Sequence, residues 1–274
     1  MKFGLAVRSM GEASRKETLL GAVRLAEKAG FDDIWIQDHL AIPPDDAEGS
    51  DGRYLDPLTT LAWLAAGTDR IGLGTGVLIL PYRSALPTAK SIATVQELSG
   101  GRLLLGVGVG WMRPEFDALG LSRSRRGRDT DRALDLIRRC FSAEDDIVEE
   151  NGQSFLFRPN PPMPPIYIGG MGRHALKRTV RYGDGWMPMG GNPADLRPQI
   201  EQLRELAESA GRNCPEVICL GGLPLGDPGA ASDQLHALSE LGVTRFICGG
   251  GRYTTVEQFK QLVDGTTAVR AAFD

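Results

Sequence analysis

The stretch that decides the fold is RIGLGTGVLIL at residues 70–80, and a second run of the same kind, RLLLGVG, follows at residues 102–108. Both runs are almost continuously apolar and do not alternate with polar residues. A strand with this pattern is buried on both faces, as in a parallel sheet that helices cover. The two runs therefore predict neighbouring parallel strands that are joined by a helix.

Working outward, the same pattern recurs in six further runs: Lys2–Arg8, Asp33–Asp38, Pro165–Gly169, Asp184–Pro188, Val217–Leu223 and Thr244–Gly249. The runs begin about 30 residues apart, which is the length of a repeated strand–helix unit. Eight such units predict an α/β fold, a (β/α)8 TIM barrel that takes residues 1–274 as one domain. A doubly wound sheet is the alternative, because a sequence alone does not show whether a sheet closes.

The interval between the runs at 102–108 and 165–169 is longer than one strand–helix unit. It holds about 30 extra residues, which predicts an insertion between strands 4 and 5, within residues 111–162. The arginines of Ser122–Arg128 lie there without interleaved aromatic residues. We therefore expect a solvated loop or helix entry at Ser122–Arg128 rather than a nucleic-acid patch.

Two helix starts can be read from local chemistry. Ser14 and Glu17 have the spacing of a capping box, and Asp56 precedes Pro57 as an N-cap precedes a proline at the first helical position. Both devices satisfy backbone N–H groups that the first turn of a helix leaves without partners.

The charge balance excludes several classes of function. The chain has 31 basic and 35 acidic residues, a formal net charge of −4, so it lacks the basic excess typical of nucleic-acid binding. No apolar run approaches the length of a membrane span, and Arg8 and Glu12 come too early for a secretory signal, so we expect a cytoplasmic protein. The four cysteines form no C-x-x-C pair, which predicts buried reduced thiols and no metal site.

In chain order the second run is Asp33–Asp38. It ends in a carboxylate beside an imidazole, Asp38 and His39. Active sites of (β/α)8 barrels lie at the carboxyl ends of the strands. A carboxylate next to a histidine can fix its tautomer and make it a proton donor near neutral pH. The plainer alternative is that Asp38 caps a turn and His39 packs in the core.

Glycines recur at every second position toward the ends of the third and fourth runs: Gly72, Gly74, Gly76, Gly106, Gly108 and Gly110. Their spacing is not that of a dinucleotide fingerprint. A glycine in a strand often marks a bulge or the close approach of a ligand, although it can also ease packing against neighbouring elements. Two flat glycine surfaces on adjacent strands favour a planar ligand between them.

The fifth run continues into a glycine turn and a helix start, PIYIGGMGRHA at residues 165–175. Backbone N–H groups at such a start point at an anion, and the helix dipole favours negative charge there. Arg173 stands in the first turn, where it could close on a phosphate. We expect a phosphate site here, with a plain tight turn as the alternative.

Taken together, these motifs and their order resemble the bacterial luciferase-like family over nearly the whole chain. The motifs are Asp38-His39, LGTGVL at 73–78, GVGVGW at 106–111, PIYIGG at 165–170 and YGDGW at 182–186. The insertion also has counterparts, in RGR at 126–128 and in Phe155, Phe157 and Pro159. The chain is most similar to the branch that uses the deazaflavin coenzyme F420, with flavin monooxygenases next.

The resemblance implies a ring-binding site at the mouth of the barrel. His39 and Asp38 match the family's strand-end pair beside the ring, which makes them the expected catalytic residues. Gly76-Val77, after Thr75, matches a bulge that supports the face of the ring and often holds a non-proline cis peptide. The remaining cofactor contacts that it implies are Gly106, Gly108 and Gly110 at the fourth strand and Gly169, Gly170, Met171 and Arg173 at the phosphate.

The resemblance leaves three functions open. The first is an F420-dependent oxidoreductase that transfers a hydride between reduced deazaflavin and a small organic substrate. The second is a monooxygenase that uses reduced FMN and oxygen, and the third is a non-catalytic flavin-binding protein. Family members that oxidise a sugar phosphate carry a glutamate where this chain has Trp111, which argues against that substrate. The expected partners are a second copy of the chain, as a homodimer, and a reductase that supplies reduced coenzyme.

Overall fold

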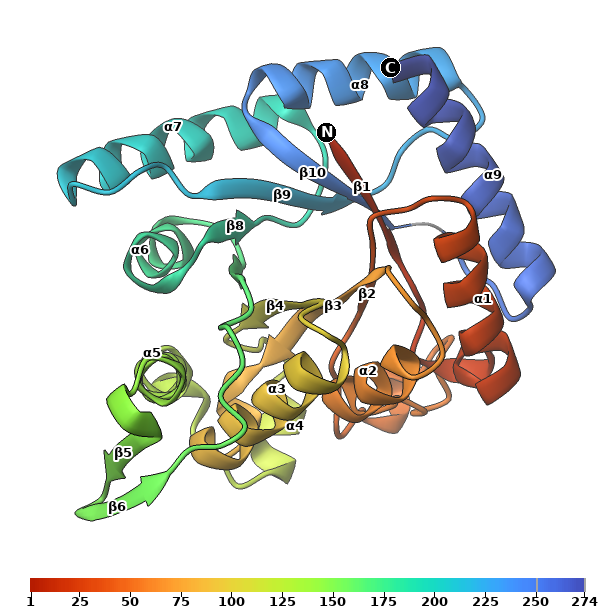
Figure 1. Ribbon diagram of the computed structural model, residues 1–274. Helices are drawn as coiled ribbons and strands as arrows, with labels where there is room; N and C mark the ends of the chain where they lie inside the picture. The colour runs from red at the N-terminus through yellow and green to blue at the C-terminus, as the bar shows by residue number, and fades with distance from the viewer. Residues whose placement is uncertain (250, 274) are drawn as a thin grey trace.

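The computed structural model describes residues 1–249 and 251–273. Eight parallel strands close into a barrel in the order β1-β10-β9-β8-β7-β4-β3-β2 (Figure 1). They are β1 (Lys2–Ala6), β2 (Asp33–Ile36), β3 (Gly72–Ile79), β4 (Leu103–Gly108), β7 (Ile166–Gly169), β8 (Gly185–Met187), β9 (Glu216–Gly221) and β10 (Val243–Cys248). Each predicted run coincides with one of these strands. The predicted barrel is confirmed, and the doubly wound alternative is wrong.

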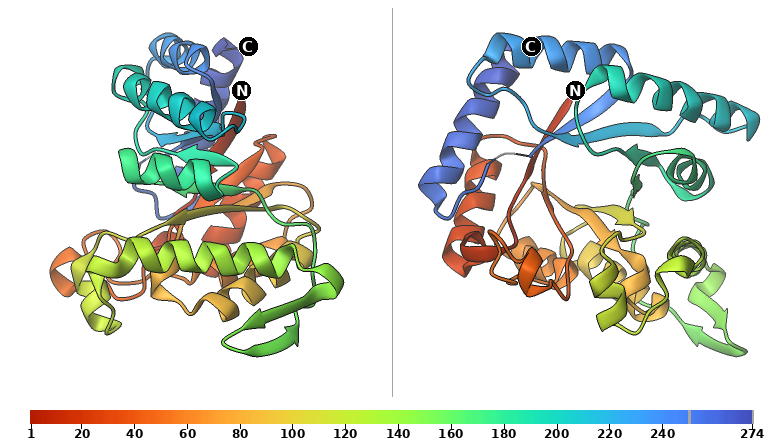
Figure 2. Two further views of the ribbon diagram at one scale, coloured as in Figure 1. Left: turned by 90° about the vertical axis from the view of Figure 1, so that its left-hand side faces the viewer. Right: turned by 180° about the vertical axis from the view of Figure 1, so that it is seen from behind.

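Helices surround the barrel and cover its outer face (Figures 1 and 2). They are α1 (Lys16–Lys28), α2 (Pro57–Ala65), α3 (Ala85–Leu98), α4 (Arg113–Ala118), α5 (Arg126–Phe141), α6 (Arg173–Tyr182), α7 (Pro193–Ser209), α8 (Pro228–Glu240) and α9 (Val256–Phe273). Short 3₁₀ turns are η1 (Gly11–Ser14), η2 (Pro44–Asp46), η3 (Leu80–Tyr82), η4 (Arg123–Arg125) and η5 (Glu144–Asp146). Since α9 packs against both α1 and α8, the last helix completes the ring.

One of the two predicted helix caps is confirmed. The carboxylate of Asp56 accepts a hydrogen bond from the Thr59 N–H at 2.9 Å at the start of α2. The capping box at Ser14 is wrong, because Ser14 belongs to η1 and α1 begins after Arg15. The Ser14 hydroxyl instead donates to the Gly11 carbonyl at 2.6 Å.

The long interval between β4 and β7 holds two elements besides a barrel helix. α5 takes the place of that helix, since it packs against both α3 and α6. The additional elements are α4 and an antiparallel hairpin of β5 (Ile147–Glu150) and β6 (Gln153–Leu156), which projects from the barrel at the lower left of Figure 1. The arginine-rich segment forms η4 and the first turn of α5, as the prediction of a helix entry requires.

The core has two layers, one between strands and helices and one inside the barrel. The inner layer includes Trp35, Tyr167, Met187, Ile218 and Ile247. Side chains therefore fill the barrel, and a ligand is left with its open end, where the parallel strands terminate together.

Two further sequence expectations concern the cysteines and the lack of a membrane span. Cys140, Cys219 and Cys248 are buried and free, as predicted, whereas Cys214 is exposed because it lies in the turn before β9. Within the described residues, no helix is both long and apolar enough to cross a lipid bilayer.

Candidate active site

Strand β3 leaves regular pairing where it reaches the carboxyl end of the barrel. Its register with β4 shifts between Thr75 and Leu78, and the Gly76–Val77 peptide bond is cis. Both the bulge and the cis peptide that the resemblance implied are therefore confirmed. Cβ atoms at Gly108 and Gly169 would come within 2.5 and 2.7 Å of the Val77 side chain. These two glycines thus allow Val77 to lie directly against β4 and β7.

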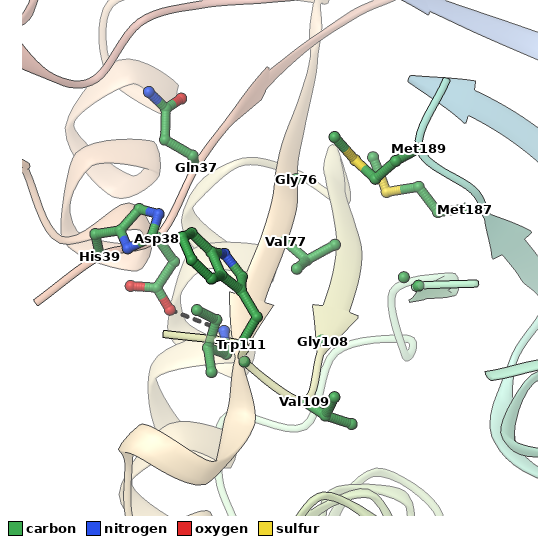
Figure 3. A pocket seen from close by; sticks show the side chains of 14 residues that line it. Gln37, Asp38, His39, Gly76, Val77, Gly108, Val109, Trp111, Met187 and Met189 are labelled. Atoms are coloured by element: carbon green, nitrogen blue, oxygen red, sulfur yellow. Dashed lines mark hydrogen bonds between the residues drawn. The ribbon is translucent and has the colours of Figure 1, made fainter. Parts of the chain in front are cut away.

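The bulge forms one wall of a cavity of about 380 Å³, which we call the mouth cavity. From β2 and β3 it takes the predicted residues Asp38, His39, Gly76 and Val77. From the ends of β4 and β7 it takes the predicted glycines Gly108, Gly110, Gly169 and Gly170. Figure 3 shows Met187 and Met189 across the cavity from Asp38 and His39. Its volume is in the range of small-molecule sites, about 300–1,000 Å³.

Four predicted cofactor contacts do not line the mouth cavity. The Thr75 side chain is fully buried and donates to the Gly106 carbonyl at 2.7 Å, so both residues belong to the seam between β3 and β4. A Cβ at Gly106 would lie 2.0 Å from the Thr75 carbonyl oxygen, so the bulge requires glycine there. Met171 and Arg173 lie beyond the cavity, exposed at the start of α6.

Asp38 does not pair with its neighbour His39. Its carboxylate accepts from the Ile79 N–H at 2.8 Å, the bond dashed in Figure 3, and from the Arg83 guanidinium at 2.5 and 2.9 Å. Burial raises the pKa of Asp38, although Arg83 and the Ile79 N–H oppose the shift. Because both oxygens are occupied from within the protein, Asp38 anchors the strand end and is not a free acid or base.

The carboxylate that holds His39 comes from α4 and is Glu115. Its Oε2 lies 2.9 Å from Nδ1 of His39. Glu115 also accepts from the backbone N–H of Leu40 and Ala41, at 2.6 and 3.1 Å, and from the Tyr82 hydroxyl at 2.9 Å. Burial opposes its charge, but these four donors together lower the pKa of Glu115 to about 2.

An ionised Glu115 can only accept hydrogen bonds, so Nδ1 of His39 must carry a proton, in the neutral ring and in the imidazolium alike. Among the described residues the other ring nitrogen, Nε2, has no hydrogen-bond partner, and 16% of the side chain is exposed. The imidazole is also packed edge-on against Tyr54 and Trp111. His39 therefore presents one oriented, unpaired nitrogen at the cavity wall.

Glu115 was missed in the sequence because it does not stand next to the strand end that it serves. A signal for Glu115 existed. It is an acid in the first turn of a short helix, just after the glycines of the fourth run. That position also suits a helix N-terminus, so the sequence did not distinguish a helix-stabilising acid from a histidine partner.

The predicted phosphate site has part of the expected geometry. Gly170 and Gly172 have φ values of 115° and 79°, and α6 begins at Arg173. One of its amides is already used, because the Gly172 N–H donates to the Gln199 side chain at 2.9 Å. In the first turn that follows, the Ala175 N–H donates to the Gly172 carbonyl at 3.0 Å, whereas the N–H groups of Arg173 and His174 stay available to an anion.

The sequence profile described as luciferase-like monooxygenase matches residues 1–239. This chain belongs to that family. A 5,10-methylenetetrahydromethanopterin reductase from Methanolobus tindarius is 33% identical over 199 residues, which cover 71% of this chain but only 56% of the reductase. Members of the family are oxidoreductases and monooxygenases.

Two solved structures show how widely this luciferase-like fold is shared. The coenzyme F420 dependent tetrahydromethanopterin reductase from Methanopyrus kandleri superposes with a TM-score of 0.75 at 18% identity and covers 100% of this chain and 99% of its own. The oxygenating constituent of 3,6-diketocamphane monooxygenase from Pseudomonas putida, in complex with FMN, gives 0.79 at 14% identity, with 98% and 96% covered. At these identities the likeness shows the fold alone.

Proposed function

We propose that this luciferase-like protein is an F420-dependent oxidoreductase. The observation that carries the proposal is the 33% identity to a methylenetetrahydromethanopterin reductase, since a tetrahydromethanopterin reductase of the same fold is F420 dependent. The mouth cavity fits a deazaflavin ring, because its walls are apolar and the backbone of the Gly76–Val77 bulge forms one side. Val77 would support the ring, and the start of α6 with Arg173 would hold the phosphate.

When bound in its reduced form, the deazaflavin supplies a hydride equivalent to an electrophilic carbon of the substrate. His39 then has one task, which it performs in its imidazolium form: its Nε2–H donates a hydrogen bond or a proton to the substrate heteroatom that gains electron density. Glu115 accepts from Nδ1–H, balances the charge of the imidazolium and fixes the ring orientation, while Asp38 and Arg83 hold the strand end on which His39 stands. The cavity excludes water from the reacting atoms, and a separate reductase regenerates the coenzyme.

An FMN-dependent monooxygenase is the second candidate, favoured by the FMN complex of the equally similar diketocamphane enzyme. The two reactions differ in their oxidant. A monooxygenase consumes oxygen with reduced FMN, whereas a deazaflavin lacks the ring nitrogen N5 and reacts poorly with oxygen.

The test is a parallel fluorescence titration of the protein with F420 and with FMN at equal ionic strength, followed by oxygen-electrode measurements. F420 binding at least about tenfold tighter than FMN binding, a difference of about 1.4 kcal/mol, supports the proposal. The reverse preference, with oxygen consumption, establishes the monooxygenase. Binding with no turnover by any acceptor supports a flavin-binding protein and overturns the proposal.

A further inference from the structure

Large apolar side chains are left exposed around the mouth of the barrel. Trp111 is 66% exposed and Met189 60%, although both line the mouth cavity. Leu40 at 43% and Met171 at 45% stand beside them, next to the lining residues His39 and Gly170. These four residues follow the carboxyl ends of β4, β8, β2 and β7, which all face the same way. Gathered exposure of this kind marks a binding site, whereas scattered apolar residues do not.

The cavity that this rim surrounds offers no counter-charge to a charged ligand. Within the described residues, no lysine or arginine lines it. Of its two titratable side chains, Asp38 is already bound to Arg83 and Ile79, and His39 is paired with the Glu115 carboxylate. A carboxylate or phosphate on the substrate would therefore lose its hydration without gaining a partner, which is unfavourable.

His39 brings a polar side chain to the cavity wall beside Trp111. The His39 imidazole lies 6.3 Å from the Trp111 ring, with the two rings almost perpendicular. Figure 3 shows Met189 on the other side of the cavity. A molecule seated there would meet the indole and the thioether with its body and the histidine with one polar atom.

We propose that the substrate is an uncharged, largely apolar carbonyl compound, with its carbon skeleton between Trp111 and Met189 and its carbonyl oxygen at His39. This inference rests on the proposed function for the reaction, but not for the binding. Trp111 and Met189 are then specificity-determining residues. They contribute through apolar contact that the ground state and the transition state share, so their loss raises KM more than it lowers kcat.

The test uses coenzyme-free protein and a neutral solvatochromic dye, Nile red, as the probe of the mouth cavity. Trp111→Ala and Met189→Ala are each expected to weaken dye binding at least about tenfold. Trp63→Ala is the matched control, because Trp63 is an exposed tryptophan on α2, away from the mouth cavity. Thermal unfolding confirms that each variant is folded. Unchanged dye binding in both mouth variants would overturn the proposal.

A competition experiment then addresses charge. 2-Naphthaldehyde and 2-naphthoate share one skeleton, and we expect the neutral aldehyde to displace Nile red at a concentration at least about tenfold lower. Met189→Lys, which places a cation on the rim, should reverse that preference. Equal or tighter binding of naphthoate to the native protein would refute the substrate class.

The same displacement is repeated with saturating F420 or FMN, whichever binds. Dye binding that persists and stays sensitive to Trp111→Ala supports a substrate site beside the coenzyme, and dye that the coenzyme expels refutes it. If neither coenzyme binds, the proposed function fails while the dye measurements still decide the substrate class. The two failures are thus distinguishable.

Discussion

The two ends of the barrel each bury a carboxylate, and they treat it in opposite ways. At the amino end, Asp33 at the start of β2 is fully buried beside Arg245 of β10 and the indole N–H of Trp35. At the mouth, Glu115 is fully buried and receives hydrogen bonds from His39, Tyr82 and two backbone N–H groups. Both side chains are thus shielded from solvent, but Asp33 lies deeper in the protein and the two sets of donors differ.

The pKa values follow the donors. Burial raises the pKa of Asp33 to about 6, because Arg245 and Trp35 only partly compensate for the lost hydration. Glu115 lies less deep, and its four donors outweigh the effect of burial and lower its pKa to about 2. The comparison teaches that a buried carboxylate becomes a fixed anion only where the fold converges enough N–H and O–H groups on it.

The two ends also differ in what they leave unpaired toward solvent. The Arg245 side chain is 6% exposed and Asp33 is fully buried, so this pair presents almost no polar surface to a ligand. At the mouth, His39 keeps an unpaired and accessible nitrogen. The amino end therefore serves stability, and the mouth serves binding.

The largest expected effect comes from breaking the amino-end pair. Arg245→Met leaves Asp33 buried without its cation and should lower the free energy of unfolding by about 3–5 kcal/mol. The double variant Asp33→Asn, Arg245→Met should recover part of that loss, because no charge is then buried. Urea unfolding measures both. A loss below about 1 kcal/mol in the single variant would show that the pair is structurally dispensable.

At the mouth, removing the His39 imidazole should affect turnover more than stability, since Glu115 keeps three of its four hydrogen-bond donors. His39→Ala is expected to lower kcat at least about 100-fold, the size of a general-acid contribution. The coenzyme Kd should change little, because backbone and apolar groups form most of the cavity wall. Steady-state kinetics and titration separate the two effects. Equal turnover would remove His39 from the reaction.

A smaller effect is expected from Glu115→Gln. The neutral amide cannot balance the charge of the imidazolium, so a smaller fraction of His39 should carry both ring protons at neutral pH, a change that ¹⁵N NMR of the ring detects. We expect kcat to fall about tenfold, with ¹⁵N-labelled His39→Ala protein as the control that assigns the signal. An unchanged protonation of the ring would contradict the role of Glu115.

The same variant tests the pH dependence. The pKa of Glu115 in the folded protein, about 2, lies below its ordinary value of 4.5. The stabilisation from its ionised form is therefore complete above pH 4.5 and is lost as the pH falls through 2. Glu115→Gln should unfold more readily than the native protein at neutral pH, and this difference should shrink across that window.

The smallest effect is expected at the edge of the mouth. Arg173 is exposed at the start of α6, so Arg173→Ala should weaken coenzyme binding only about fivefold and leave the unfolding transition in place. Lys177→Ala, on the next turn of α6, is the control for loss of charge alone. Unchanged affinity in Arg173→Ala would place the phosphate elsewhere.

The glycines of β3 show where prediction from the sequence stopped. Gly72, Gly74 and Gly76 have the same spacing, and all three fitted a flat surface for a ligand. A Cβ at Gly74 would collide with the Trp35 ring at 2.3 Å, and one at Gly72 would lie 2.9 Å from Asp33, so both make room for packing. Only Gly76 reaches the mouth cavity. Both interpretations of the glycines, room for packing and room for a ligand, are therefore correct, at different positions of one strand.

Local and repeated features were determined by the sequence itself. Continuous apolar runs at a regular interval required buried parallel strands, and the turn after β7 required glycines at positions of positive φ. What only the tertiary structure decided is which side chains meet. Glu115 reaches His39 from 76 positions along the chain, whereas Asp38, its immediate neighbour, binds Arg83. Asp38 and His39 lie in the loop after β2, so no regular strand geometry pairs them, and closure of the barrel brought a different acid to the histidine.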